Sequence, residues 1–159
     1  MIQHVWSVLC ARAVIDSESN NISLFDVVEQ IVAIGPGIAA IAPGAEGVVP
    51  VSLELVTLWS RDSLDEATRG RARLRIVGPD GMQIGNPFEY EVDLTNFVRI
   101  RNRFRMAAFP IRGPGKYSVV IETEQDGSWR QVAQVPVQLV MQIQELESGE
   151  RQPVAARPI

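Results

Sequence analysis

The chain has 159 residues, of which 46% are hydrophobic, and a formal net charge of -4. This length and composition predict one domain with a sizeable core and exclude a natively disordered chain. The acidic balance argues against a nucleic-acid binder, because such proteins normally carry a basic excess on one face.

The first 34 residues predict two strands joined by a turn. Residues 4–15 are rich in Val, Ile and Trp and lack the apolar stripe of a surface helix, so we expect a long strand. The polar run 16–21 predicts a turn, because Asp, Asn and Ser side chains can bond their own backbone. Residues 22–34 predict a second strand. A helix over 24–33, capped by Ser23 or Asp26, is the alternative.

The segment 34–47 is expected to be a loop because of its Pro-Gly and Gly-Pro steps, yet its centre is apolar. Apolar loops of this length are unusual, since exposed apolar side chains usually contact a partner. One interpretation is a flap over one end of the core. The other is a contact surface for another chain or an apolar ligand, which makes Ile38 and Ile41 candidate interaction residues.

The rest of the chain predicts further strands separated by turn residues. They cover residues 48–60, 69–77, 82–93, 97–109, 116–124 and 129–142. Pro50 and Pro136 should lie at a strand end, an edge or a bulge, because proline cannot donate to a sheet. This pattern predicts an all-β fold, an antiparallel β-sandwich of about seven to nine strands, immunoglobulin-like or C2-like, with a small β-barrel as the alternative. We expect the domain to span residues 1–143 and residues 144–159 to form a flexible tail.

Three ladders of like charge follow one another, with members two residues apart. They are Arg69, Arg71, Arg73 and Arg75, then Glu89, Glu91 and Asp93, then Arg99, Arg101, Arg103 and Arg105. Strand spacing places each ladder on one face of its strand. Four such charges repel by roughly 0.6 kcal/mol per neighbouring pair even in water, so each Arg row requires an opposing group.

The acidic row is the expected opposing group. If residues 88–93 and 97–103 form an antiparallel hairpin, acid and base face each other, and the acidic strand lies between the two Arg strands. Eight Arg against three acids still leave five Arg, which could bind an acidic protein, a polyanion or a phosphate. The candidate surface therefore also includes Arg71, Arg73, Arg99, Arg101, Arg103 and Arg105.

Groups that support catalysis are scarce. His4 is the one histidine and is expected at a sheet edge, so a site with several histidines cannot form within one chain. Cys10 is the one cysteine; it is expected to be a buried apolar residue, and its lack of a disulfide partner fits a reducing, cytoplasmic location. No signal peptide or membrane span is indicated. We therefore expect no catalytic residue, no cofactor, no metal and no membrane contact.

Calcium binding, as in C2 domains, is a minor alternative, because calcium requires several oxygen ligands at one point. The candidate loop acids are Asp16, Glu18, Asp62, Asp65, Glu66, Asp80 and Asp126.

The segments VWSVLCARAVIDSESNNISLFDVVEQI, VTLWSR and IRGPGKYSVVIE resemble a family of small bacterial β-sandwich proteins of unknown function. The resemblance covers most of residues 4–142 and is most specific in the first two strands with their Asn-Asn turn. It implies a bacterial source and a β-sandwich, and it implies no activity, cofactor or catalytic residue. The GPGKY turn is also similar to the last hairpin of immunoglobulin-like and C2-like domains, which bears on fold alone.

The leading functional hypothesis is a non-catalytic module for protein interaction or structure, including assembly with copies of itself. Its contact surface would be the loop around Ile38 and Ile41 or an edge strand. The alternative is an anion-binding module that uses the Arg99 to Arg105 face.

Overall fold

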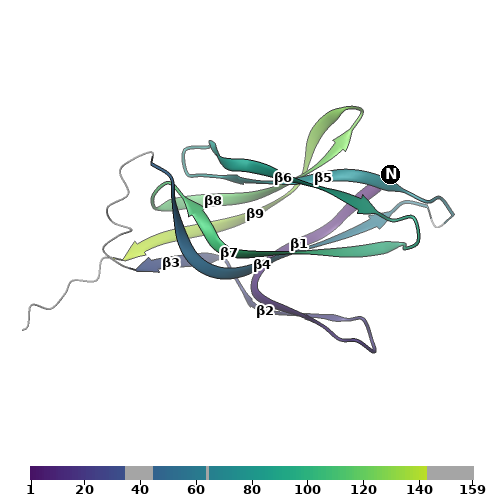
Figure 1. Cartoon of the computed structure of the whole chain (residues 1–159), viewed down its shortest axis with the longest axis horizontal. Helices are drawn as coiled ribbons and strands as arrows, with labels where there is room; N and C mark the ends of the chain where they lie inside the picture. The colour runs from purple at the N-terminus through teal and green to yellow at the C-terminus, as the bar shows by residue number, and fades with distance from the viewer. Residues whose placement is uncertain (35–44, 64, 143–159) are drawn as a thin grey trace, which may run out of the picture.

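The structure, a computed structural model, describes residues 1–34, 45–63 and 65–142, which form nine strands in two sheets packed face to face (Figure 1). The strands are β1 Ile2–Ile15, β2 Ile22–Val27, β3 Gln30–Ile34, β4 Gly47–Arg61, β5 Arg69–Val77, β6 Gln83–Asp93, β7 Arg99–Ile111, β8 Gly115–Gln125 and β9 Ser128–Gln142. The predicted all-β sandwich is confirmed. Ile38, Ile41 and the predicted tail 144–159 lie outside the described residues.

Sheet A has the strand order β2-β1-β4-β7, and sheet B has the order β3-β9-β8-β5-β6. Neighbouring strands are antiparallel except β3 and β9, which are parallel. The last strands of the two sheets, β6 and β7, lie on the same side of the sandwich, where the rings of Phe88 and Phe104 are 5.6 Å apart. Among the described residues, no helix has the length and apolar character needed to cross a bilayer.

The single strand predicted for residues 22–34 is instead two strands in different sheets, and the alternative helix over 24–33 does not form. The change of sheet occurs where Asp26 has a φ of +52° and the Val28 N–H donates to the Leu9 carbonyl at 2.8 Å. The Glu29 carbonyl then accepts from the Gln138 N–H at 2.8 Å, which brings the chain beside β9. The alternating pattern indicated strand conformation, but it could not show this crossing.

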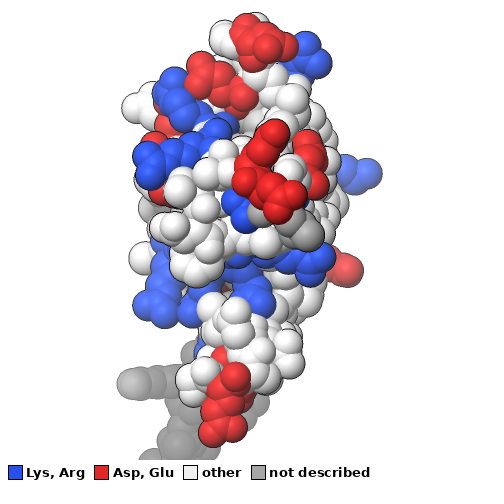
Figure 2. Space-filling model, turned by 90° about the vertical axis from the view of Figure 1, so that its right-hand side faces the viewer, with Lys and Arg blue, Asp and Glu red and all other residues white. Residues whose placement is uncertain are grey.

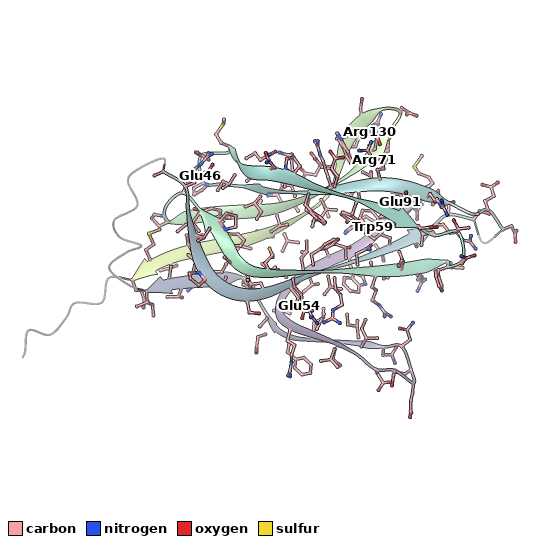
Figure 3. The ribbon with its side chains drawn as sticks, in the orientation of Figure 1. Glu46, Glu54, Trp59, Arg71, Glu91 and Arg130 are labelled. Carbon is pink, nitrogen blue, oxygen red and sulfur yellow. The ribbon has the colours of Figure 1, made fainter. Side chains whose placement is uncertain are left out.

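The main core lies between the sheets, where Trp59, Phe109 and Tyr117 are fully buried (Figure 3 labels Trp59). A smaller apolar cluster covers the outer face of sheet A, with Cys10, Ala13 and Val56 buried. It forms because β1 pairs with β4 only up to Cys10; beyond this residue β1 pairs with β2 alone. The resulting β1–β2 hairpin projects from the body of the sandwich (Figure 1).

The tight turn before β8 requires glycine at position 115. Gly115 has a φ of +140°, and a Cβ there would lie 2.8 Å from the Pro79 Cβ. We expect Gly115→Ala to lower the free energy of unfolding by about 1 to 3 kcal/mol. Urea denaturation measures this loss. Gly81→Ala is the control, because Gly81 also has a positive φ but no atom within 4 Å of the added Cβ; equal losses would contradict a role for the Pro79 contact.

Candidate binding face on strand β7

The charge ladders do not form the predicted hairpin. β6 pairs with β5 in sheet B, whereas β7 pairs with β4 in sheet A, so the expected pairing of residues 88–93 with 97–103 is wrong. The connection crosses between the sheets because Leu94 is fully buried in the core and its N–H donates to the Thr68 carbonyl at 2.8 Å. The two Arg ladders therefore lie on opposite outer faces of the sandwich and have different surroundings.

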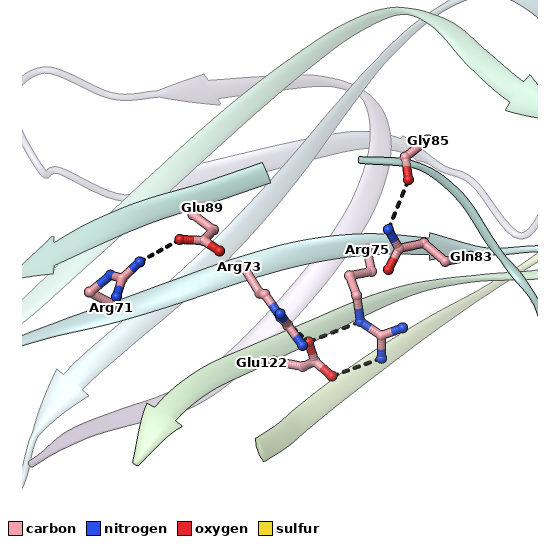
Figure 4. Close-up of polar contacts among 7 residues, drawn as sticks. All are labelled: Arg71, Arg73, Arg75, Gln83, Gly85, Glu89 and Glu122. Carbon is pink, nitrogen blue, oxygen red and sulfur yellow. Dashed lines mark hydrogen bonds and ion pairs between the residues drawn. The ribbon is translucent and has the colours of Figure 1, made fainter. Parts of the chain in front are cut away.

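The Arg ladder of β5 lies between two acidic rows. On one side, Arg69, Arg71 and Arg73 are opposite Asp93, Glu91 and Glu89 of β6. On the other side, β8 supplies Glu122 and Glu124, which form ion pairs with Arg73, Arg75 and Arg71 (Figure 4 shows the Glu122 contacts). Four Arg are thus matched by five carboxylates, and no excess of basic charge remains on this face.

Glu122 is the centre of this network. Its side chain accepts hydrogen bonds from Arg73 and from Arg75, whose Nε and Nη2 donate at 2.9 and 2.8 Å, and the residue is 5% exposed. The hydrogen bond from Arg75 lowers the pKa of Glu122, burial opposes it, and with the contribution of Arg73 the net pKa lies below its usual value. The Arg73 guanidinium also lies 4.5 Å from the Trp129 ring centre. The candidate residues Arg71 and Arg73 are therefore occupied by internal contacts.

Within the described ranges, the Arg ladder of β7 forms ion pairs with one carboxylate, that of Glu54. The β4 residues opposite Arg99, Arg101, Arg103 and Arg105 are Ser60, Leu58, Val56 and Glu54. Arg103 donates to Glu54 at 2.7 Å, and Arg105 lies 3.4 Å from the same carboxylate. Figure 3 shows Glu54 on the side of sheet A that faces the hairpin. Burial raises the pKa of Glu54. The hydrogen bond and charge of Arg103 and the charge of Arg105 together lower this pKa by more than burial raises it, so the net pKa is below its usual value.

Two Arg side chains of this ladder hold the β1–β2 hairpin. Arg103 donates to the Ala13 carbonyl at 2.8 Å, and Arg101 donates to the Asn20 carbonyl at 2.7 Å. Arg99 makes no ion pair or side-chain hydrogen bond with the described residues, and the Arg105 side chain is 76% exposed. We call the side chains of Arg99, Arg101, Arg103 and Arg105 the β7 face.

A groove of about 520 Å³ separates the hairpin from the start of β7. It is lined by Ile15, Asn20, Leu58, Phe97, Arg99, Ile100 and Arg101. Phe97 is 60% exposed, so its apolar ring is accessible to solvent in the same groove as Arg99. Figure 2 shows basic side chains gathered in a band between the sandwich and the projecting hairpin. The groove therefore presents both positively charged and apolar side chains to a ligand.

The remaining candidate groups are held by internal contacts. Cys10 is fully buried, and burial raises the pKa of its thiol. His4 is half-buried against Trp59 at 5.2 Å, donates to or accepts from the Ser7 hydroxyl at 2.7 Å, and burial lowers its pKa. No three acidic, histidine or cysteine side chains within the described ranges gather where they could hold a metal ion. Asp16 instead accepts hydrogen bonds from Ser19.

In a comparison with known proteins, no family model and no curated protein matches the chain. The resemblance to a family of small bacterial β-sandwich proteins stays a prediction.

Of the site residues, the sequence indicated the eight Arg of the ladders but missed Glu54, Glu122 and Glu124. Glu122 reaches Arg73 and Arg75 across 49 and 47 positions of sequence, and Glu54 reaches Arg103 across 49. The available signal was weak: Glu122 and Glu124 are also two residues apart, which is strand spacing. Nothing in the spacing specified which Arg ladder these acids would adjoin.

Proposed function

We propose that the protein is a non-catalytic binding module whose β7 face recognises an acidic segment of another protein. The contrast between the two Arg ladders carries this proposal. The β5 ladder lies among five carboxylates, whereas among the residues that the structure describes the β7 face pairs with Glu54 alone. Arg presents a planar fork that suits bidentate binding of carboxylates, and an Arg without a carboxylate partner can bind one from outside.

The groove favours a polypeptide over a bare anion. Phe97, Ile15 and Leu58 lie beside Arg99, so a ligand that brings both carboxylates and apolar groups would contact the whole surface. Polypeptides combine both. The net charge of -4 and the acidic rows of sheet B oppose long nucleic acids, because phosphate chains would be repelled over much of the molecule.

Two further observations support a non-catalytic role. The thiol of Cys10 is buried, donates to the Glu54 carbonyl at 3.5 Å, and has a pKa raised by burial and by the charge of Glu54, and the half-buried His4 is held against Trp59. A reactive thiol normally lies in exposed, electropositive surroundings. A bacterial cytoplasm is part of the proposal, and it rests on the sequence resemblance and on the unpaired thiol.

Charge reversal on the β7 face tests the proposal. We expect a fluorescein-labelled acidic octapeptide, with Glu alternating with Val, to bind the full chain in a fluorescence anisotropy titration. Arg99→Glu/Arg105→Glu should weaken this binding by at least about tenfold, since loss of two charge-assisted contacts exceeds about 1.4 kcal/mol. Both side chains are exposed, but Arg105 lies 3.4 Å from Glu54, so circular dichroism of the variant must first match that of the wild type. Binding should also weaken as salt is raised from low to physiological concentration.

Arg69→Glu/Arg130→Glu is the matched control, because it makes the same change of net charge at two exposed Arg of sheet B and should leave peptide affinity unchanged. Peptide binding that is absent, or equal in the wild type and the Arg99→Glu/Arg105→Glu variant, would contradict the proposal. Tight binding of heparin that the peptide does not displace would instead indicate a polyanion site.

A further inference from the structure

We propose that the acidic segment binds as an added β-strand along the free edge of β7, and that its acidic residues alternate with apolar ones. This inference rests on the proposed function, since it specifies the partner of the same face. Three features of the described residues support it: the open edge of β7, a cavity beside that edge, and the way in which β6 pairs with β5.

The edge of β7 is long and open. β7 has 13 residues and is the last strand of sheet A, with β4 on one side and no described strand on the other. An edge strand leaves every second backbone N–H and C=O group without a strand partner. An extended peptide can satisfy these groups by adding a strand to the sheet.

An apolar cavity of about 530 Å³ opens between this edge and β6. Four consecutive residues of β7, from Arg103 to Met106, line it. Their side chains point alternately to opposite faces, so the backbone edge itself must form part of the wall. Leu74 and Ile84 of sheet B contribute apolar side chains, and Phe88, which is 56% exposed, also lines it, with its ring 5.6 Å from that of Phe104. A strand beside β7 could therefore direct its inward side chains into an apolar space.

The mouth of the cavity is formed by an irregularity in β6. The register with β5 shifts between Leu74 and Ile76, where the three residues Gly85, Asn86 and Pro87 of β6 lie opposite Arg75 alone, so that β6 has two extra residues. Gly85 has a φ of +67°, and both Gly85 and Asn86 line the cavity. The inserted residues interrupt the β6 ladder and leave the space beside β7 open.

The pairing of β5 with β6 shows which pattern of side chains a strand needs in order to pair with an Arg ladder. Glu89, Glu91 and Asp93 of β6 lie opposite the Arg ladder of β5, while Tyr90 and Val92 of the same strand point into the core. β7 presents the same Arg spacing at a free edge. A partner strand with alternating acidic and apolar residues would place its acids by the β7 face and its apolar side chains in the cavity.

The same charges oppose pairing between two copies of β7. An antiparallel pair of β7 strands would bring two rows of Arg together, and like charges directly opposite each other are destabilising. The β7 face therefore favours a partner of opposite charge and disfavours a symmetric dimer through this edge.

Three peptides of equal Glu and Val content test the mode of binding with the full chain. The first alternates Glu and Val, the second places all Val before all Glu, and the third is the alternating peptide with N-methyl groups on every second amide, made in two forms that block opposite edges. Fluorescence anisotropy should show that the second peptide and at least one N-methylated form bind about tenfold more weakly than the first. N-methylation removes main-chain donors and leaves the side-chain charges, so this loss distinguishes strand addition from contact through charge alone.

A protein variant supplies an independent readout. Phe88→Ser, which removes the ring from the cavity lining without adding a charge, should weaken the alternating peptide more than the block peptide, because only the alternating peptide directs a continuous row of Val side chains into the cavity. Phe88 is exposed but its ring contacts those of Tyr90 and Phe104, so circular dichroism of the variant must first match that of the wild type.

The outcomes separate the two proposals. If all three peptides bind equally and Arg99→Glu/Arg105→Glu still abolishes binding, the proposed function stands and strand addition is wrong. If no acidic peptide binds, the proposed function fails. Sedimentation tests the remaining outcome. If the protein is a dimer that charge reversal on β7 dissociates and the alternating peptide does not, a second copy occupies the edge and the inference is overturned.

Discussion

Replacing Glu54 with alanine is expected to lower the free energy of unfolding by about 3 kcal/mol, the lower end of the range for breaking a buried ion pair. The Glu54 side chain is 10% exposed and the Arg103 side chain 27%. Without Glu54, the Arg103 guanidinium would keep the Ala13 carbonyl as its hydrogen-bond partner and would lose its counter-charge. Urea denaturation followed by tryptophan fluorescence measures the change.

Glu89→Ala is the matched control. Glu89 also pairs with an Arg, but the side chains of Arg71 and Glu89 are 54% and 44% exposed. Exposed pairs contribute about 0 to 1 kcal/mol, so this variant should lose little. A double-mutant cycle between Glu54→Ala and Arg103→Ala isolates the pair itself. Equal losses for Glu54→Ala and Glu89→Ala would contradict the structural role of Glu54.

Acid is expected to destabilise the protein through Glu54 and Glu122. Both carboxyl groups have a folded pKa below the usual value of 4.5, Glu122 because of its hydrogen bonds from Arg75 and Arg73, and Glu54 because the Arg103 and Arg105 contacts outweigh the opposing effect of burial. The unfolded chain therefore binds protons first as the pH falls. The contribution to stability is complete above the unfolded pKa and is lost as the pH falls through the folded pKa, at about 1.4 kcal/mol per unit of separation.

The test compares urea midpoints between pH 7 and pH 3 for the wild type and for Glu54→Gln/Glu122→Gln. The wild type should lose stability steeply below about pH 4.5, and the variant should show a shallower dependence. His4 also lowers the stability as the pH falls below 6.5, because burial lowers the pKa of His4 in the folded state. This loss of stability is the same in both proteins and cancels in the difference between them. The same slope in both proteins would contradict the assignment.

The sequence predicted local structure well because local chemistry determines it. The Asn20-Asn21 turn, the Gly78 to Gly81 turn and the strand spacing of the ladders all appear at the expected positions. Pro50 and Pro136 also lie where proline is tolerated: the former near the start of β4 at a register shift, and the latter where β3 does not yet accompany β9.

The pairing of distant strands could not be predicted in the same way. Alternation along a strand shows which residues share a face, but it does not show which strand lies alongside. The acidic row was expected between the two Arg strands, and the side of it that pairs with β5 is as predicted, whereas the hairpin with the following strand, β7, does not form. Instead, the burial of Leu94 turns the chain into the core, and β5, the strand before it, remains the partner. This difference determines which Arg ladder is neutralised and which is available for binding.

The most direct test of the account is amide hydrogen exchange of the protein with and without a saturating amount of the alternating Glu-Val peptide. Strand addition at β7 predicts slower exchange for amides between Arg99 and Ile111, on the edge that does not face β4, with β3 and β2 unchanged. Binding of the peptide without new protection in β7, or with protection at another edge, would contradict the central claim that β7 is the edge that receives the partner.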